Sequence, residues 1–486
     1  MTFELNNKYN IQAECFNQVV YNADNIAKIT NNVFCLIDVP ITLANNHQLA
    51  LGPDFSGMFT WASDSYINTV LNHFLNIFSF NYITNMSYAF YLCMSWKGKP
   101  IYAPLVTNMA GTYADCYNIT GTPICGSLVT DMYYTYSSCY NLTGSPVCGD
   151  NVETMAYTYS SCYNLTGSPV CGPKVITMAD AYASCRNLTG QPVCGSNVTN
   201  MYSTYSYCYN LTGSPICGPK VTNMASAYRG CGNLTGTPMC GDNVTDMAFT
   251  YYGCRNLTGS PICGSKVTNI ASAYSDCYNL TGQPVCEDNV TDMSSAYYNC
   301  FNLTGSPVCG PKVTTMISAY YNCTNLTGSP IVGANVRYMN YAYYNCINLT
   351  GSPAVTSAEN IWVYMNCAYY NCTNLTGAPV FCNSPAADFA YTYYNCVNLK
   401  GNCYFNMPLA NIEGQNYMLI NFASCFKGCP GPIALYVKER AIFNNIYNYN
   451  TGTSCIVGEN VAWININTNA FKTSNNSLTV IYSPGN

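Results

Sequence analysis

Residues 221–240 read VTNMASAYRGCGNLTGTPMC, and most of the chain repeats this stretch with small changes. Its central cysteine, Cys231, belongs to a column of cysteines that recurs every 23 residues from Cys93 to Cys346. The steps then change to 26, 24 and 29 residues, which gives Cys372, Cys396 and Cys425. A fixed period of roughly 20 to 50 residues is typical of solenoids and other repeat arrays.

Other positions are fixed relative to the cysteine. Leu or Ile follows after three residues, Pro after seven, Val after thirteen and Met after sixteen, and an aromatic residue stands three before the next cysteine. In the unit of Cys231 these residues are Leu234, Pro238, Val244, Met247 and Tyr251. About six apolar or small columns cannot close a core within one unit, so the units must bury them by stacking.

The column pattern resembles the BspA-like class of leucine-rich repeats, whose units read roughly C-x-x-L-x-x-I-x-I-P, then V-x-x-I, then A-F. The resemblance covers residues 83–433 and implies a right-handed solenoid. Two departures stand out: position six is Ser, Thr, Gln or Ala, and the proline comes two residues early. Because proline cannot donate to a ladder, each parallel strand is predicted to span only about three or four residues.

We therefore expect an α/β leucine-rich-repeat-like solenoid of about fifteen units, built from short parallel strands and short helices. The segment from Met224 to Cys231 has apolar residues at i, i+3, i+4 and i+7, the spacing of a helix face. Residues 1–82 are interpreted as an N-terminal cap or attachment segment. Residues 434–486 are interpreted as a C-terminal cap or small β module.

The cysteine count is high, at 31 of 486 residues. Stacked side chains in one column point in parallel, so we expect free, buried thiols rather than disulfides. The same is expected for a second column of nine, which runs from Cys125 to Cys309 and stands nine residues after the first. The sequence leaves open a bridge among the cysteines outside both columns: Cys15, Cys35, Cys367, Cys382, Cys403, Cys429 and Cys455.

Charge is sparse, because only 8% of the residues are charged and the formal net charge is −5. No basic patch is present, which argues against nucleic acid as a partner. The first residues lack the pattern of a secretory signal, and no segment reaches 18 apolar residues, so neither signal-directed export nor membrane insertion is expected.

A period of 46 residues overlies the first period. The residue twelve after the cysteine alternates strictly: Lys174, Asn197, Lys220, Asn243, Lys266, Asn289, Lys312 and Asn335. Duplication of two-unit blocks explains this alternation most simply. It is expected to place each lysine near carboxylates of a neighbouring unit.

Catalytic chemistry has little support in the sequence. The two histidines, His47 and His73, lie outside the repeats, and no phosphate loop, metal motif or nucleophile elbow occurs. We expect a protein that is not an enzyme, with no catalytic residue, no metal site and no cofactor.

A second tyrosine column, two residues before the cysteine, supplies the candidate ligand-binding residues. Its members are Tyr252, Tyr298, Tyr321, Tyr344, Tyr370 and Tyr394. Asparagine usually follows, and the candidate amides are Asn299, Asn322 and Asn345. On a helix these residues would face outward, where rings stack on sugars and amides bond hydroxyls. The alternative is that the column reflects composition and stacking between units.

The Asn-Leu-Thr triplets also match the acceptor pattern for N-glycosylation, but most of them are interpreted as turn residues rather than glycan sites. Proteins with the resembled repeats are commonly surface adhesins. Together with the low charge and the near-identical units, this favours a phage tail protein that is extracellular and virion-associated. Such a protein would contact host cell-surface glycan or protein, and other virion proteins. The alternatives are a structural decoration or filament subunit, a homo-oligomer among them, and a bacterial cell-surface adhesin.

Overall fold

The computed structural model describes residues 53–60, 80–355, 363–380, 389–401 and 425–429 with their side chains, and the backbone of further short strands. The chain divides into two compact units, residues 1–234 and 235–486, and each is described by itself. Apart from residues 53–60, 80–82 and short strands, the predicted caps lie outside the described residues. The described residues contain no helix with the length and apolarity that a membrane span requires.

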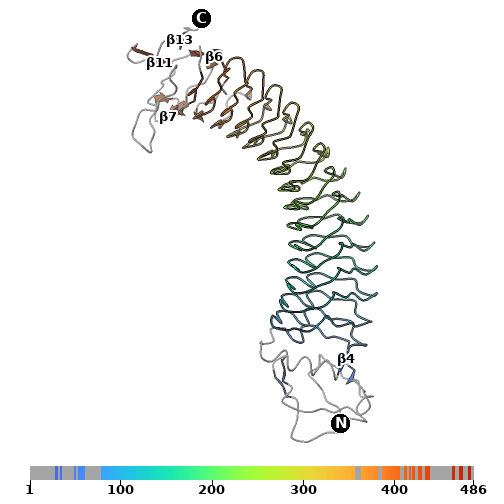
Figure 1. Cartoon of the computed structure of the whole chain (residues 1–486). Helices are drawn as coiled ribbons and strands as arrows, with labels where there is room; N and C mark the ends of the chain where they lie inside the picture. The colour runs from blue at the N-terminus through green and yellow to red at the C-terminus, as the bar shows by residue number, and fades with distance from the viewer. Residues whose placement is uncertain are drawn as a thin grey trace. The chain divides into compact units, whose positions relative to one another are not determined.

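Short strands occur near both ends of the chain (Figure 1). Those of the first unit are β1 (Lys28–Thr30), β2 (Val33–Cys35), β3 (Leu49–Ala50) and β4 (Phe78–Ser79). Those of the second unit are β5 (Ala386–Asp388), β6 (Gly401–Phe405), β7 (Ala410–Ile412), β8 (Gln415–Tyr417), β9 (Leu419–Asn421), β10 (Ile433–Val437), β11 (Ala462–Asn465), β12 (Ala470–Thr473) and β13 (Val480–Tyr482).

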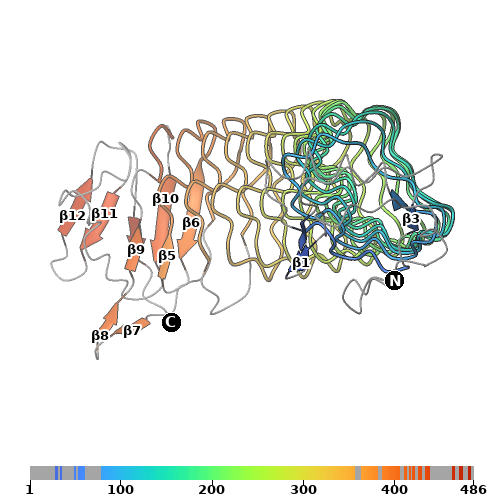
Figure 2. The same cartoon turned by 90° about the horizontal axis from the view of Figure 1, so that it is seen from below.

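These strands form six small sheets. Strands β6, β10 and β13 make a parallel three-stranded sheet in which Gly401 pairs with Ile433 and Leu435 with Val480. Figure 2 shows β6 beside β10. The pairs β3–β4 and β5–β9 are also parallel, whereas β1–β2, β7–β8 and β11–β12 are antiparallel.

Within each unit the repeats stack as successive turns of a solenoid, which confirms the predicted repeat solenoid (Figure 1). A parallel bridge of one residue joins each turn to the next. In the first unit this column runs Asp54, Asn85, Asn108, Asp131, Thr154, Thr177, Asn200 and Asn223; in the second it runs Asp246, Asn269, Asp292, Thr315, Tyr338 and Tyr364. The prediction of strands of three or four residues in every repeat was wrong, since the described repeats between β4 and β5 make only isolated bridges.

The predicted short helices are also absent from the described residues, which contain no α-helix. In the segment from Met224 to Cys231, Ala227 N donates to Met224 O at 2.9 Å and Cys231 N to Tyr228 O at 3.0 Å, which are turns rather than helical bonds. Ser226 and Gly230 have φ of 58° and 75°, in the left-handed region. A right-handed helix cannot contain such residues, so the segment forms a ribbon of alternating turns.

The backbone N–H groups that are not used within the turns donate to carbonyl oxygens of the next repeat. Met109 N donates to Asp131 O at 2.9 Å, and Gly111 N to Tyr133 O at 2.7 Å. This turn ribbon thereby satisfies its backbone groups, which must be paired when they are buried. The helix-like spacing of apolar residues arises because the ribbon also turns the same positions inward.

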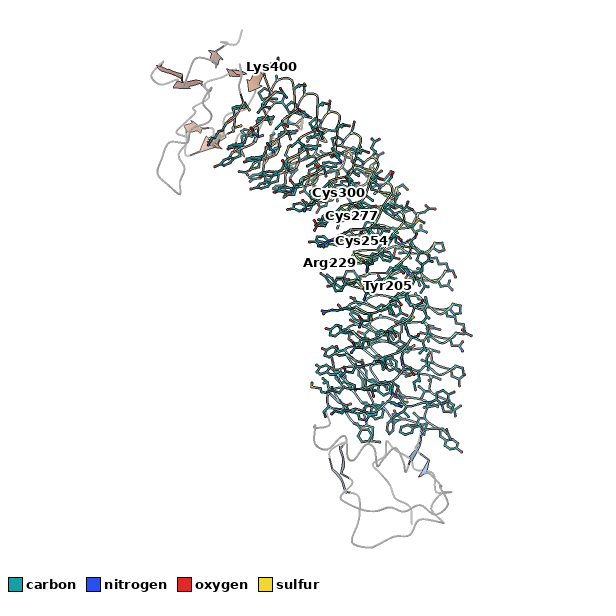
Figure 3. All side chains as sticks on the ribbon, viewed as in Figure 1. Tyr205, Arg229, Cys254, Cys277, Cys300 and Lys400 are labelled. Atoms are coloured by element: carbon teal, nitrogen blue, oxygen red, sulfur yellow. The ribbon has the colours of Figure 1, made fainter. Side chains whose placement is uncertain are left out.

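The core consists of the predicted columns. Val244, Met247, Tyr251, Cys254 and Leu257 are all fully buried. Figure 3 shows Cys254, Cys277 and Cys300 following one another along the second unit. The first cysteine column is free and buried as predicted. Its thiols donate to carbonyls of the preceding repeat, for example Cys277 Sγ to Tyr251 O at 3.1 Å and Cys300 Sγ to Tyr274 O at 3.0 Å. The second column is free but only half-buried, contrary to the expectation of burial.

The buried tyrosine of each repeat closes its own turn with its hydroxyl. Tyr182 Oη donates to Val170 O at 2.6 Å and accepts from Val170 N at 3.0 Å. The same clamp recurs from Tyr113 to Tyr393, always on the residue that follows the proline position. The clamp satisfies both backbone groups of that residue, which explains why tyrosine stands where the resembled family has phenylalanine.

The register of the last repeat differs from the prediction. Phe426 stacks on Tyr393 with ring centroids 5.7 Å apart, and Cys429 Sγ donates to Tyr393 O at 3.1 Å. Cys429 therefore holds the column position that the sequence assigned to Cys425. At the other end, Phe59 stacks on Phe90 at 5.6 Å, so the repeating contacts begin before residue 83.

The lysine column has a different partner from the one predicted. Lys174 Nζ donates to Asn151 Oδ1 at 2.8 Å, an amide oxygen of the preceding repeat rather than a carboxylate. The same contact recurs at Lys220, Lys266 and Lys312. Because each lysine needs an asparagine before it, the contact gives the 46-residue period a physical reason.

Candidate functional site

Five of the six candidate tyrosines form one continuous stack in the second unit. The ring centroids of Tyr298, Tyr321, Tyr344, Tyr370 and Tyr394 are 4.5 to 4.6 Å apart, and successive planes lie within 12° of parallel. All five are half-buried, so they line the surface as predicted. Tyr252 is half-buried too but stands outside this stack, tilted against Phe249 at 6.1 Å.

The candidate asparagines bond one another along the same repeats. Asn345 Nδ2 donates to Asn322 Oδ1 at 2.9 Å, Asn322 to Asn299 at 2.9 Å, and Asn299 to the carboxylate of Asp276 at 2.8 Å. Asn371 and Asn395 extend this asparagine ladder. All the amides point the same way, so the bonds polarise one another and end on a charged acceptor. Each amide keeps a second hydrogen and a second lone pair.

The stack changes how these tyrosines can meet a ligand. A ring whose two faces contact neighbouring rings at about 4.5 Å cannot also stack on a sugar. The inner rings of the stack, Tyr321, Tyr344 and Tyr370, can offer a ligand only their hydroxyls and ring edges. The hydroxyl of Tyr344 is hydrogen-bonded to that of Tyr321, and burial raises the pKa of Tyr344 to about 12. The hydroxyl of Tyr344 is therefore neutral at physiological pH.

Lys427 lies beside the last tyrosine of the stack. Its ammonium is 5.9 Å from the ring centroid of Tyr394, within the range of a cation–π contact. The stack thus has an acidic group, Asp276, at the start of its asparagine ladder and a basic group at its other end.

Four further tyrosines enlarge the site, and the sequence analysis did not identify them. The rings of Tyr338 and Tyr364 stack with their centroids 5.4 Å apart. The ring centroids of Tyr341 and Tyr391 each lie 6.0 Å from that of the stack member three residues later in the chain, Tyr344 and Tyr394. The exposed fractions of the four further tyrosines are 37 to 44%. They stand eight and five residues before the column cysteine. We define the tyrosine face as these four residues with the five of the stack.

The first unit has its own aromatic rows. Tyr117, Tyr140 and Tyr163 stack at 4.8 and 4.9 Å, and the guanidinium of Arg186 lies 4.7 Å from the ring centroid of Tyr163. Tyr134 stacks on Tyr157 at 4.5 Å. A hydrogen bond links Tyr157 to Asp180, and burial of Asp180 raises the pKa of its carboxyl. These rows are shorter than the stack of the second unit.

The part of the chain that the structure describes contains no cluster of metal ligands. None of its His, Cys, Asp and Glu side chains gather in groups of three or more that could hold a metal ion. His47 and His73 lie outside the described residues. What remains is a fixed array of neutral hydroxyls and amides with one charged group near each end.

Comparisons with known proteins add little. No protein-family model matches the sequence, and no curated protein matches it. Among solved structures, a leucine-rich repeat protein from Bacteroides ovatus is similar to this chain, with 14% sequence identity and a TM-score of 0.45. The match covers 88% of this chain and 95% of that protein. A likeness of this degree does not carry over a ligand or an activity.

Proposed function

We propose that this chain is a non-enzymatic recognition protein that binds an extended polymer at a cell surface through the tyrosine face. The observation that carries the proposal is the stack of five half-buried tyrosines, Tyr298 to Tyr394, repeated at 4.5 to 4.6 Å beside a ladder of amides. Tyrosine is enriched at binding surfaces because it combines apolar area with a polar group at little entropic cost.

A polymer suits this array better than a small molecule. Each repeat of the stack offers the same hydroxyl and amide, so a ligand with its own repeat gains from many weak contacts at once. The hydroxyls favour a partner rich in donors and acceptors, such as a surface glycan. The four exposed tyrosines would pack against its apolar edges.

We place the protein on a phage particle, as a tail-associated receptor-binding or adhesion protein. The near-identity of successive repeats favours this placement, because it indicates repeated duplication of two-unit blocks. The alternative placement is the surface of a bacterial cell. A structural decoration or filament subunit is the second candidate function, and the same tyrosine face would then pack on a neighbouring copy.

The test is binding of the purified chain to candidate host cells, with and without enzymatic removal of the surface polysaccharide. Binding that disappears on removal supports a glycan-directed adhesin. Binding that survives removal but not protease treatment of the cells redirects the proposal to a surface protein. The absence of binding, together with self-association in sedimentation, would favour the structural subunit.

A further inference from the structure

The first unit contains an aromatic cluster that the proposed recognition function does not use. Tyr133 packs against Tyr134 and Tyr157 with ring centroids 4.6 and 6.2 Å apart and interplanar angles of 65° and 85°. Tyr134 and Tyr157 stack on each other at 4.5 Å. Tyr133 is 38% exposed, so an exposed ring stands steeply inclined to a stacked pair of half-buried rings.

Tyr88 joins this cluster across a glycine. A Cβ at Gly111 would collide with the ring of Tyr88, so that ring covers the glycine. Gly111 N donates to Tyr133 O at 2.7 Å, which places the Tyr88 ring close to the backbone of Tyr133. Burial is the main cause of the raised pKa of Tyr88, and the negative charge of Asp131 adds to it. We define the aromatic cluster as Tyr88, Tyr133, Tyr134 and Tyr157.

The backbone gives no reason for tyrosine at three of these positions. Tyr88, Tyr134 and Tyr157 hold equivalent places in their repeats, with φ of 54°, 56° and 57°. Later in the unit the same place is taken by Ser203 and Ser226, also with positive φ. A left-handed φ disfavours a bulky side chain, so the large rings indicate a role at the surface.

Carboxylates flank the cluster on its other side as well. The hydroxyl of Tyr157 is hydrogen-bonded to Asp180. The pKa of Tyr134 is raised chiefly by burial, and the charges of Asp180 and Asp115 add to the rise. Cations of this unit have other contacts: asparagine amides for Lys174 and Lys220, and rings outside the cluster for Arg186 and Arg229.

We propose that the aromatic cluster binds a quaternary ammonium group, such as the trimethylammonium of choline. Tyrosine rings attract a cation by its contact with their faces, and the carboxylates of Asp115, Asp131 and Asp180 complement its charge. A primary ammonium suits the cluster less well because it is compact and strongly hydrated. This site lies in the first unit and does not depend on the tyrosine face.

The test begins with calorimetric titration of the full-length chain with choline. The uncharged tert-butyl analogue of choline has the same shape without the charge, and ethanolamine keeps the charge on a primary ammonium. We expect choline to bind in the millimolar range and both analogues to bind at least about fivefold more weakly.

Two pairs of variants locate the site. Tyr88→Leu with Tyr133→Leu removes the two exposed rings of the cluster and should weaken choline binding at least about fivefold. The control, Tyr102→Leu with Tyr209→Leu, removes two other exposed rings of the same unit and should bind like the wild type. Circular dichroism checks that both variants are folded.

The second pair removes charge without removing rings. Asp115→Asn with Asp131→Asn keeps an oxygen that can accept from Tyr133 N, as Asp131 Oδ1 does at 2.8 Å, and should also weaken choline binding. Asp242→Asn with Asp288→Asn loses the same charge in the second unit and should not. Equal weakening within either pair, equal affinity for choline and its tert-butyl analogue, or no choline binding by the wild type would overturn the proposal.

Discussion

The tyrosine clamp gives the sharpest prediction about stability. Tyr182→Phe keeps the buried ring, which stacks on Tyr159 and Tyr205 at 5.5 and 5.6 Å, and removes only the hydroxyl. That hydroxyl pairs both Val170 N and Val170 O. Each unpaired buried group costs about 1 to 3 kcal/mol. Because Val170 is half-buried and water partly replaces the hydroxyl, we expect a loss of about 2 to 4 kcal/mol in the free energy of unfolding.

The matched control is Tyr321→Phe, which removes a hydroxyl from a half-buried ring and leaves no backbone group unpaired. Substitutions of this kind usually change stability by about 0.5 kcal/mol or less. Urea unfolding gives the global value. Hydrogen exchange of the peptide around Val170 gives the local value, which matters because repeat arrays unfold in parts. Equal effects for Tyr182→Phe and Tyr321→Phe would refute the clamp.

Three further predictions follow from single contacts. Gly218→Ala should destabilise the chain by about 1 to 3 kcal/mol, because its Cβ meets Cys194 Sγ at 2.8 Å; Gly126→Ala, whose Cβ has nothing nearer than 3.5 Å, should be neutral in the same thermal unfolding assay. Asn322→Ala should lower the free energy of unfolding by about 2 to 3 kcal/mol in urea, because the substitution breaks two hydrogen bonds of the asparagine ladder and puts alanine at a left-handed φ of 59°. Asn322→Gly should cost less because glycine adopts this φ without strain, and a larger cost for glycine than for alanine would contradict this reasoning. Burial raises the pKa of Cys194 and Cys240 from 9.0 to about 11, so the stability they contribute is complete below pH 9 and is lost as the pH rises through 11. Urea midpoints between pH 8 and 11.5 should therefore fall less in Cys194→Ser, Cys240→Ser than in the wild type, and parallel falls would contradict this assignment.

Much of the architecture followed from the sequence because stacking requires a strict period. The columns of Cys254, Leu257 and Tyr251 are buried as the period predicts. The helix prediction failed because the spacing of apolar residues shows only which side chains face the core. A ribbon of alternating left- and right-handed turns points the same positions toward the core as a helix does. The sign of φ at Ser226 or Asn322 leaves no trace in the apolar pattern.

The candidate site was predicted in part. The stack from Tyr298 to Tyr394 follows from the fixed position of these tyrosines two residues before each column cysteine. Tyr341 and Tyr391 were missed because Cys367 holds the equivalent position in the repeat between them, so the two tyrosines form no continuous column in the sequence. The Cys429 register was missed because Phe426, rather than the cysteine spacing, continues the buried aromatic column.

The central claim is that the tyrosine face binds the ligand. The most direct measurement is the affinity of the purified chain for host cells in two triple variants, Tyr298→Phe, Tyr321→Phe, Tyr344→Phe and, as the control, Tyr117→Phe, Tyr140→Phe, Tyr163→Phe. Three lost hydrogen bonds at about 0.5 to 1.5 kcal/mol each predict at least a tenfold weaker Kd for the first variant. The control should bind like the wild type. Unchanged binding by the first variant, or equal weakening in both, would contradict the account.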